Sequence, residues 1–117
     1  MNKQTPIVYL NKKSKAGNEP VYFNKTELGL ILNLYGRMVS AGLWRDYSLE
    51  ESRKSISFNV YKRASDQPIY RMQKSPHLAA KQGAYAILGQ GGVLLKRGHT
   101  LDTLLKYFNK KLIKAID

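Results

Sequence analysis

The stretch SISFNVYKR, residues 55–63, alternates apolar and polar side chains and decides how the chain folds. Ile56, Phe58 and Val60 share one face, because successive side chains of a strand point to opposite faces. Residues Ala64–Gln67 separate this stretch from PIYRMQK, residues 68–74, which is also typical of a strand. A short polar loop between two such segments predicts a β-hairpin.

The length of this loop predicts which side chains share a face. With a four-residue loop, Tyr61 lies opposite Tyr70, on the face away from Phe58, and Arg63 and Lys74 share that outer face. Tyrosines beside cations can stack bases and hold phosphates, as in proteins that bind single strands. An ordinary cross-strand tyrosine pair explains the same pattern, and both interpretations remain open.

A second hairpin is predicted from AYAIL, residues 84–88, and VLLKR, residues 93–97. The glycines of the intervening GQGG, residues 89–92, suggest a phosphate-binding loop, but such a loop leads into a helix and this one leads into a strand. We therefore expect turn glycines with positive φ. In the tight register Leu88 faces Val93 and Ile87 faces Leu94, so both faces are apolar and need a cover.

A helix is predicted to begin at Asn24, which has capping-box spacing with Glu27, and to end at Gly42. Its apolar side comprises Leu28, Ile31, Leu32, Tyr35, Met38 and Val39. A stripe of small residues on the other side comprises Gly29, Asn33, Gly36 and Ser40. Such a stripe suits close packing, either within the chain or in a homodimer. Trp44 is expected to anchor the core, and Ser48 with Glu51 to cap a short turn.

A last helix is predicted to follow Thr100, with Leu101, Leu104, Leu105, Phe108, Leu112 and Ile116 on its buried side. The fold class is therefore α+β: a helix, a four-stranded antiparallel sheet of two hairpins, and a C-terminal helix. Residues 21–117 form one domain, and residues 1–20 form a basic flexible arm. Within this arm Ile7–Leu10 is apolar and could add an edge strand. That segment, or a second copy of the chain, could cover the second hairpin.

Charge is the strongest compositional signal, with 20 Lys and Arg against 8 Asp and Glu in 117 residues, a net charge of +12. A basic surface of this size attracts polyanions. We expect a nucleic-acid-binding protein, for DNA or RNA. The alternatives are a small adaptor or regulator that docks on an acidic protein partner, and a basic surface that is merely solvated.

Two groups of basic residues are candidate phosphate contacts. Lys96, Arg97, His99 and Thr100 stand where a strand gives way to a helix, whose unpaired amide groups attract anions. Along that helix Lys106, Lys110 and Lys114 recur every four residues on the exposed side, with Lys111 beside them. We expect one or both groups to hold phosphate. A solvated face, or contact with an anionic membrane surface, would give the same stripe.

Several function classes find no support in the sequence. There is no cysteine, so disulfides and thiolate chemistry are excluded. We expect no enzyme, no cofactor and no metal, because no pair of carboxylates and no metal-ligand spacing is present. No apolar run has the roughly 20 residues that a membrane helix needs, and no export signal is evident. The expected location is the cytoplasm.

Three blocks carry a resemblance: LYGRMVSAGLWRDYSL at 34–49, YKRASDQPIYRMQKSPHLAAKQGAYAI at 61–87, and LLKRGHTLDTLLK at 94–106. Together they resemble a family of small basic proteins, known chiefly from alphaproteobacteria and classed as a domain of unknown function. The resemblance covers residues 21–108. It implies a bacterial cytosolic protein, and it implies no activity, cofactor or site residue.

Overall fold

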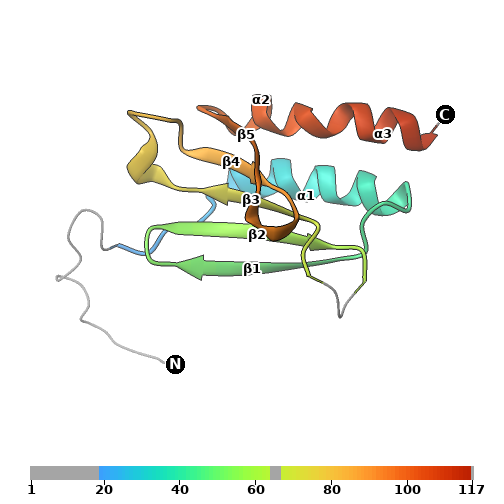
Figure 1. Ribbon diagram of the computed structural model, residues 1–117, viewed down its shortest axis with the longest axis horizontal. Helices are drawn as coiled ribbons and strands as arrows, with labels where there is room; N and C mark the ends of the chain where they lie inside the picture. The colour runs from blue at the N-terminus through green and yellow to red at the C-terminus, as the bar shows by residue number, and fades with distance from the viewer. Residues whose placement is uncertain (1–18, 64–66, 117) are drawn as a thin grey trace.

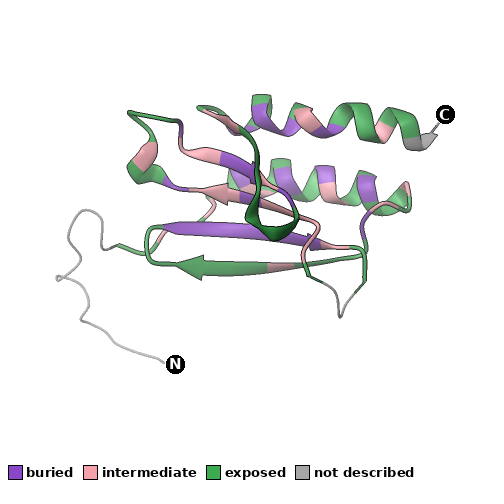
Figure 2. Ribbon diagram, viewed as in Figure 1, coloured by how far each residue is buried: buried purple, intermediate pink, exposed green. Residues whose placement is uncertain are grey.

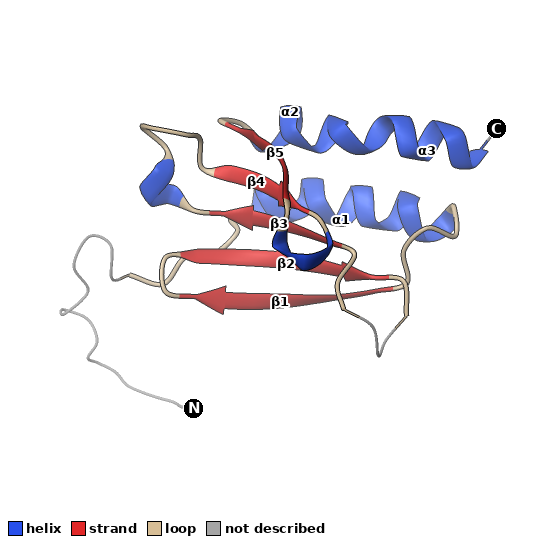
Figure 3. Cartoon of the chain, in the orientation of Figure 1, coloured by secondary structure: helices blue, strands red, loops and turns tan. Residues whose placement is uncertain are grey.

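The computed structural model describes residues 19–63 and 67–116, with side chains as far as residue 114. The helices are α1 (Lys25–Ser40), α2 (Leu101–Leu105) and α3 (Asn109–Ile116), and the 3-10 turns are η1 (Pro76–Leu78), η2 (Gln90–Gly92) and η3 (Lys106–Phe108). The strands are β1 (Asp46–Ser52), β2 (Ser55–Tyr61), β3 (Tyr70–Lys74), β4 (Tyr85–Leu88) and β5 (Leu94–Gly98). Figure 3 shows these elements along the chain.

The five strands form one antiparallel sheet in the order β1-β2-β3-β4-β5. Figure 1 shows α1 and the α2–α3 segment side by side against one face of this sheet. The predicted α+β class is confirmed, but the sheet has five strands instead of four. No helix among the described residues has both the length and the apolar character to cross a membrane.

The additional strand is β1, where the sequence favoured a turn capped by Ser48 and Glu51. Instead, all seven residues of β1 pair with β2, from Asp46 opposite Tyr61 to Ser52 opposite Ser55. The composition DYSLEES is poor in strand formers. Pairing with the buried strand β2 therefore overrides the local preference.

The first hairpin, β2 with β3, has a register one residue away from the predicted one. Val60, and not Tyr61, lies opposite Tyr70, and Phe58 lies opposite Met72. A slip of one residue moves every side chain of a strand to the other face. Tyr70 and Lys74 therefore lie on the helix-covered face, and the predicted outer-face pair of Tyr61 and Tyr70 is wrong.

The second hairpin, β4 with β5, is confirmed, and Gly91 in its turn has the expected positive φ of 72°. The turn is longer than predicted, because the amide of Gly89 donates to the carbonyl of Val93. A register shift next to Leu88 then places Leu94 opposite Leu88 and Lys96 opposite Ile87. The predicted pairs of Leu88 with Val93 and Ile87 with Leu94 are therefore wrong.

The core lies between the sheet and the helices, and Figure 2 shows its buried residues on both layers. It comprises Ile31, Leu34, Met38, Trp44, Phe58, Val60, Met72, Ile87, Leu101, Leu104, Leu105 and Phe108. Trp44 is thus a core anchor, as predicted. On α1, however, Leu32 and Val39 are about 40% exposed, although the sequence analysis placed them on the buried side. The segment Ile7–Leu10 and most of the predicted arm lie outside the described residues.

Candidate functional site

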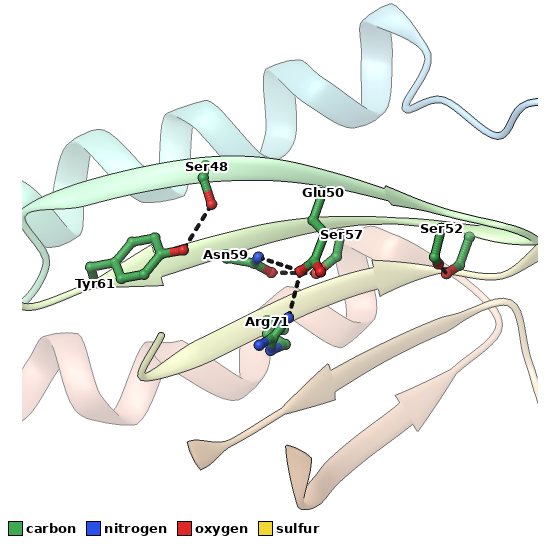
Figure 4. A network of polar contacts seen from close by, with 8 residues as sticks. Ser48, Glu50, Ser52, Ser57, Asn59, Tyr61 and Arg71 are labelled. Carbon is green, nitrogen blue, oxygen red and sulfur yellow. Dashed lines mark hydrogen bonds and ion pairs between the residues drawn. The ribbon is translucent and has the colours of Figure 1, made fainter. Parts of the chain in front are cut away.

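The face of the sheet away from the helices carries a network of polar side chains, shown in Figure 4. The hydroxyls of Tyr61 and Ser48 lie 2.9 Å apart. The Glu50 carboxylate accepts from the amide of Asn59 at 2.9 Å and from the guanidinium of Arg71 at 2.6 Å. These two hydrogen bonds hold the pKa of Glu50 below its ordinary value. The charge of Arg71 is thus matched by Glu50 on this face.

Lys74, predicted as an outer-face phosphate contact, instead points toward the start of α1. Its ammonium donates to the Glu27 carboxylate and to the backbone carbonyl of Tyr22, both at 2.8 Å. Glu27 also closes the predicted capping box with Asn24. The Tyr85 hydroxyl donates to the second carboxylate oxygen of Glu27. Lys74 is therefore engaged in a structural ion pair.

The pKa values of this cluster follow from its burial and its hydrogen bonds. Burial raises the pKa of Glu27, but the hydrogen bonds from Lys74, Tyr85 and the Asn24 amide, together with the Lys74 charge, outweigh it and leave this pKa below its ordinary value. Burial, the hydrogen bond to Glu27 and the charge of Glu27 raise the pKa of Tyr85 to about 12. At neutral pH the cluster therefore holds an ionised Glu27 and a protonated Tyr85.

The predicted anion site at the β5–α2 junction has two kinds of side chain. Lys96, His99 and Thr100 are exposed, and Thr100 is the N-cap residue but makes no side-chain hydrogen bond there. Arg97 turns toward the loop before β4, where its guanidinium donates to the Gly83 carbonyl at 3.1 Å. Its Nε atom is buried and has no hydrogen-bond partner among the residues that the structure describes. Arg97 thus supports the fold, and Lys96 remains the exposed cation of this group.

A cleft of about 420 Å³ opens near the C-terminal end of the α2–α3 segment. It is lined by Met38, Leu43, Trp44, Lys62, Ile69, Tyr70, Lys111 and Lys114. We call it the lysine–aromatic cleft. Lys62 follows β2, Tyr70 begins β3, and the other two lysines belong to α3. Elements that are far apart in the sequence therefore bring three exposed lysines to one hollow.

Aromatic rings form the base of this cleft. The rings of Tyr70 and Phe108 meet edge to face with centroids 5.0 Å apart, and those of Trp44 and Phe108 do the same at 5.1 Å. The Lys111 ammonium lies 6.0 Å from the ring centroid of Tyr70 and 5.6 Å from that of Tyr107. Such packing fixes the Tyr70 ring, which is half-buried, and places the Lys111 ammonium over one face of that ring.

Of the predicted site residues, Tyr70 and Lys114 meet in the lysine–aromatic cleft, whereas Tyr61 and Lys74 do not line it. Lys106 lines a different hollow, of about 580 Å³, between α1 and the α2–α3 segment, together with Arg37. Lys110 is exposed on α3, and Arg63 is exposed just after β2. The sequence analysis gave no site role to Lys62 and treated Lys111 only as a flanking residue. The spacing of Lys111 four residues after Tyr107 was the available signal, because such residues are neighbours on a helix.

The comparisons with known proteins identify a family and no further relative. Neither the curated proteins nor the solved structures contain a match to this chain. The family described as "Protein of unknown function (DUF2794)" matches residues 21–105, from just before α1 to the end of α2. The match includes Lys62 and Tyr70 and ends before Lys111. Because it covers well over half of the 117 residues, the chain belongs to the DUF2794 family.

Proposed function

We propose that this protein binds nucleic acid, and that single-stranded segments enter the lysine–aromatic cleft. One observation carries the proposal: Lys62, Lys111 and Lys114 line one hollow together with the half-buried Tyr70. This is the combination that single-strand binders use, with cations for the phosphates and an aromatic face for a base. The net charge of +12 supports the same class of partner.

The two kinds of side chain would contribute differently to binding. Each lysine that neutralises a phosphate releases a condensed counterion, so its contribution falls as salt rises. Stacking on Tyr70 depends little on salt and is tolerant of base identity, because every base has a π-face. The proposal thus predicts affinity that is sensitive to salt and only weakly sensitive to sequence.

Other basic positions support the proposal less well. Arg71 and Lys74 are paired with Glu50 and Glu27 respectively. Lys96 is exposed, but the lysine that lies over aromatic rings in the described part of the chain is Lys111. The cleft is therefore the place where charge and stacking coincide. An acidic protein partner would use the charge without the stacking, and this difference separates the two partners in an experiment.

The protein offers a direct readout, because Trp44 is its single tryptophan and lines the cleft. Its fluorescence is titrated with single- and double-stranded oligonucleotides and with polyglutamate at two ionic strengths. The triple variant Lys62→Gln, Lys111→Gln, Lys114→Gln is compared with a control of equal charge loss, Lys25→Gln, Arg53→Gln, Lys81→Gln. The control residues are exposed and lie outside the cleft.

For the cleft variant we expect weaker binding to single strands and a salt slope shallower by about 2 units, at roughly 0.7 per phosphate contact. Tyr70→Leu should weaken binding by roughly 1–3 kcal/mol and leave the salt slope unchanged. Equal losses in the two triple variants would show that binding follows net charge alone. Tighter binding to polyglutamate than to any oligonucleotide would favour the acidic protein partner.

A further inference from the structure

The edge strand β1 presents an apolar surface that the described part of the chain leaves open. β1 pairs with β2 on one side only. Its Tyr47 and Leu49 lie on the helix-covered face and are 46% and 52% exposed. One side of the Tyr47 ring stacks on Phe58, with centroids 4.6 Å apart. Such an edge, with its unpaired backbone groups, is a template for another strand.

One side of α1 extends this apolar surface. Leu28, Leu32, Tyr35 and Val39 follow one another at spacings of three and four residues and therefore share a side of the helix. The Tyr35 ring contacts that of Tyr47 edge to face at 5.0 Å, which directs this side toward β1. Leu32 and Val39 are about 40% exposed. Open backbone and exposed apolar side chains thus occur together at this edge of the fold.

The charge of β1 indicates what kind of strand fits this edge. Asp46, Glu50 and Glu51 are three of the chain's eight acidic residues, and all three stand in this seven-residue strand. If β1 paired with β1 of a second copy, the Asp46 and Glu51 carboxylates of both copies would gather along one seam, beside the two Glu50 carboxylates that Arg71 already pairs, which is unfavourable. A basic segment would instead complement the acidic strand. The fitting occupant is therefore extended, apolar and flanked by cations.

One segment of this chain outside the described residues has that composition. Ile7-Val8-Tyr9-Leu10 is apolar, and Lys3, Lys12, Lys13 and Lys15 flank it. Glu19 and Pro20 line a hollow together with Lys54, at the turn between β1 and β2 (Figure 1). The eight residues from 11 to 18 can span up to about 27 Å, which exceeds the roughly 23 Å length of a seven-residue strand.

We propose that residues 7–10 pair with the open edge of β1 in the same chain, as a sixth strand of the sheet. Alternate side chains of this segment would cover Tyr47 and Leu49. The flanking lysines would lie near Asp46, Glu50 and Glu51. This inference does not rest on nucleic-acid binding, because it is argued from residues that do not line the lysine–aromatic cleft.

The test uses the full chain and two variants that each lower the net charge by two units. Val8→Asp with Tyr9→Asp introduces one charge on each face of the proposed strand, so that neither register can bury the segment. Asn2→Asp with Gln4→Asp makes the same change of charge and spares residues 7–10. Amide hydrogen exchange is measured across β1, and light scattering gives the molar mass.

We expect a monomer in which exchange at Tyr47–Glu51 becomes at least tenfold faster in the Val8, Tyr9 variant and stays unchanged in the Asn2, Gln4 variant. Equal exchange in all three proteins would overturn the proposal. A dimer that keeps β1 protected in every variant would show that a second copy covers the edge. A dimer that dissociates only in the Val8, Tyr9 variant would show that residues 7–10 pair with β1 of a second copy, and would overturn the proposal that they pair within one chain.

Discussion

At the scale of single residues, Gly83 holds the end of the second hairpin in place. Its φ is 101°, and a Cβ atom built on it would lie 2.5 Å from the Gly98 carbonyl oxygen. Gly83→Ala should therefore lower the free energy of unfolding by about 1–3 kcal/mol, because the backbone conformation is unfavourable and Gly98 must also move. Urea denaturation measures this change.

Gly29→Ala is the matched control, since Gly29 lies inside α1 and an added Cβ meets no atom within 4 Å. This variant should be more stable than the natural protein by up to about 1 kcal/mol, because alanine favours a helix over glycine. Opposite signs for the two alanines are expected. If Gly83→Ala proved as stable as the natural protein, the close approach of Gly98 would be wrong.

At the scale of elements, Glu27 joins the start of α1 to β3 through Lys74 and to β4 through Tyr85. Its pKa in the fold lies below the ordinary value of 4.5. A lowered carboxylate pKa stabilises the fold above the ordinary pKa, and this stabilisation is lost as pH falls through the folded value. Glu27→Gln should cost on the order of 3 kcal/mol near neutral pH, because Lys74 loses its charged partner.

Unfolding by urea at pH 7 and at successively lower pH checks this prediction. The difference in stability between the natural protein and Glu27→Gln should shrink as pH falls below about 4.5, because Glu27 binds a proton there in the unfolded chain and only at lower pH in the fold. Glu51→Gln, at an exposed position of β1, serves as the control and should change stability little. A difference that stays constant down to pH 3 would contradict the role of the Glu27 charge.

Most of the helices and strands could be predicted from the sequence. Helix α1 and its cap, both hairpins and the last helix follow from local signals, namely capping residues, periodicity and turn glycines. The register between two strands is not a local signal. β2 ends at Tyr61 and β3 starts at Tyr70, so the connection is longer than the four-residue polar loop from which the register was predicted. β1 was missed because its pairing with β2, and not its composition, makes it a strand.

The lysine–aromatic cleft was only partly predictable for a related reason. Tyr70 and Lys114 were chosen from the sequence, but for two different surfaces, and Lys62 was not chosen at all. The three meet because the register of β3 turns Tyr70 toward the helices and α3 ends beside it. Arg97 is the opposite case, a residue predicted for the site that instead supports the fold. Its basic neighbours suggested phosphate binding, and nothing local in the sequence indicated its hydrogen bond to the Gly83 carbonyl.

At the scale of the whole molecule, exposed lysines along the α2–α3 segment define a path that a bound polyanion would follow. The lysine–aromatic cleft is lined by Lys111 and Lys114 of α3. Lys96 belongs to β5, which leads into α2 at the other end of the helical segment from the C-terminus of α3 (Figure 1). Lys106 and Lys110 lie between them along the chain and are exposed. A nucleic-acid chain that contacts both Lys96 and the lysine–aromatic cleft would therefore run along the α2–α3 segment.

This path predicts different results for single changes of charge. Lys96→Gln should keep the thermal midpoint, because its side chain is exposed, and should make the salt slope for a long oligonucleotide shallower by about 0.7 unit. Arg97→Gln should also lower the thermal midpoint, since it removes the hydrogen bond to Gly83. Lys25→Gln, outside the path, controls for the loss of one charge. If Lys96→Gln binds with unaltered affinity and slope while Lys106→Gln with Lys110→Gln loses both, the polyanion follows the helix without reaching the β5–α2 junction, and the predicted anion site there is wrong.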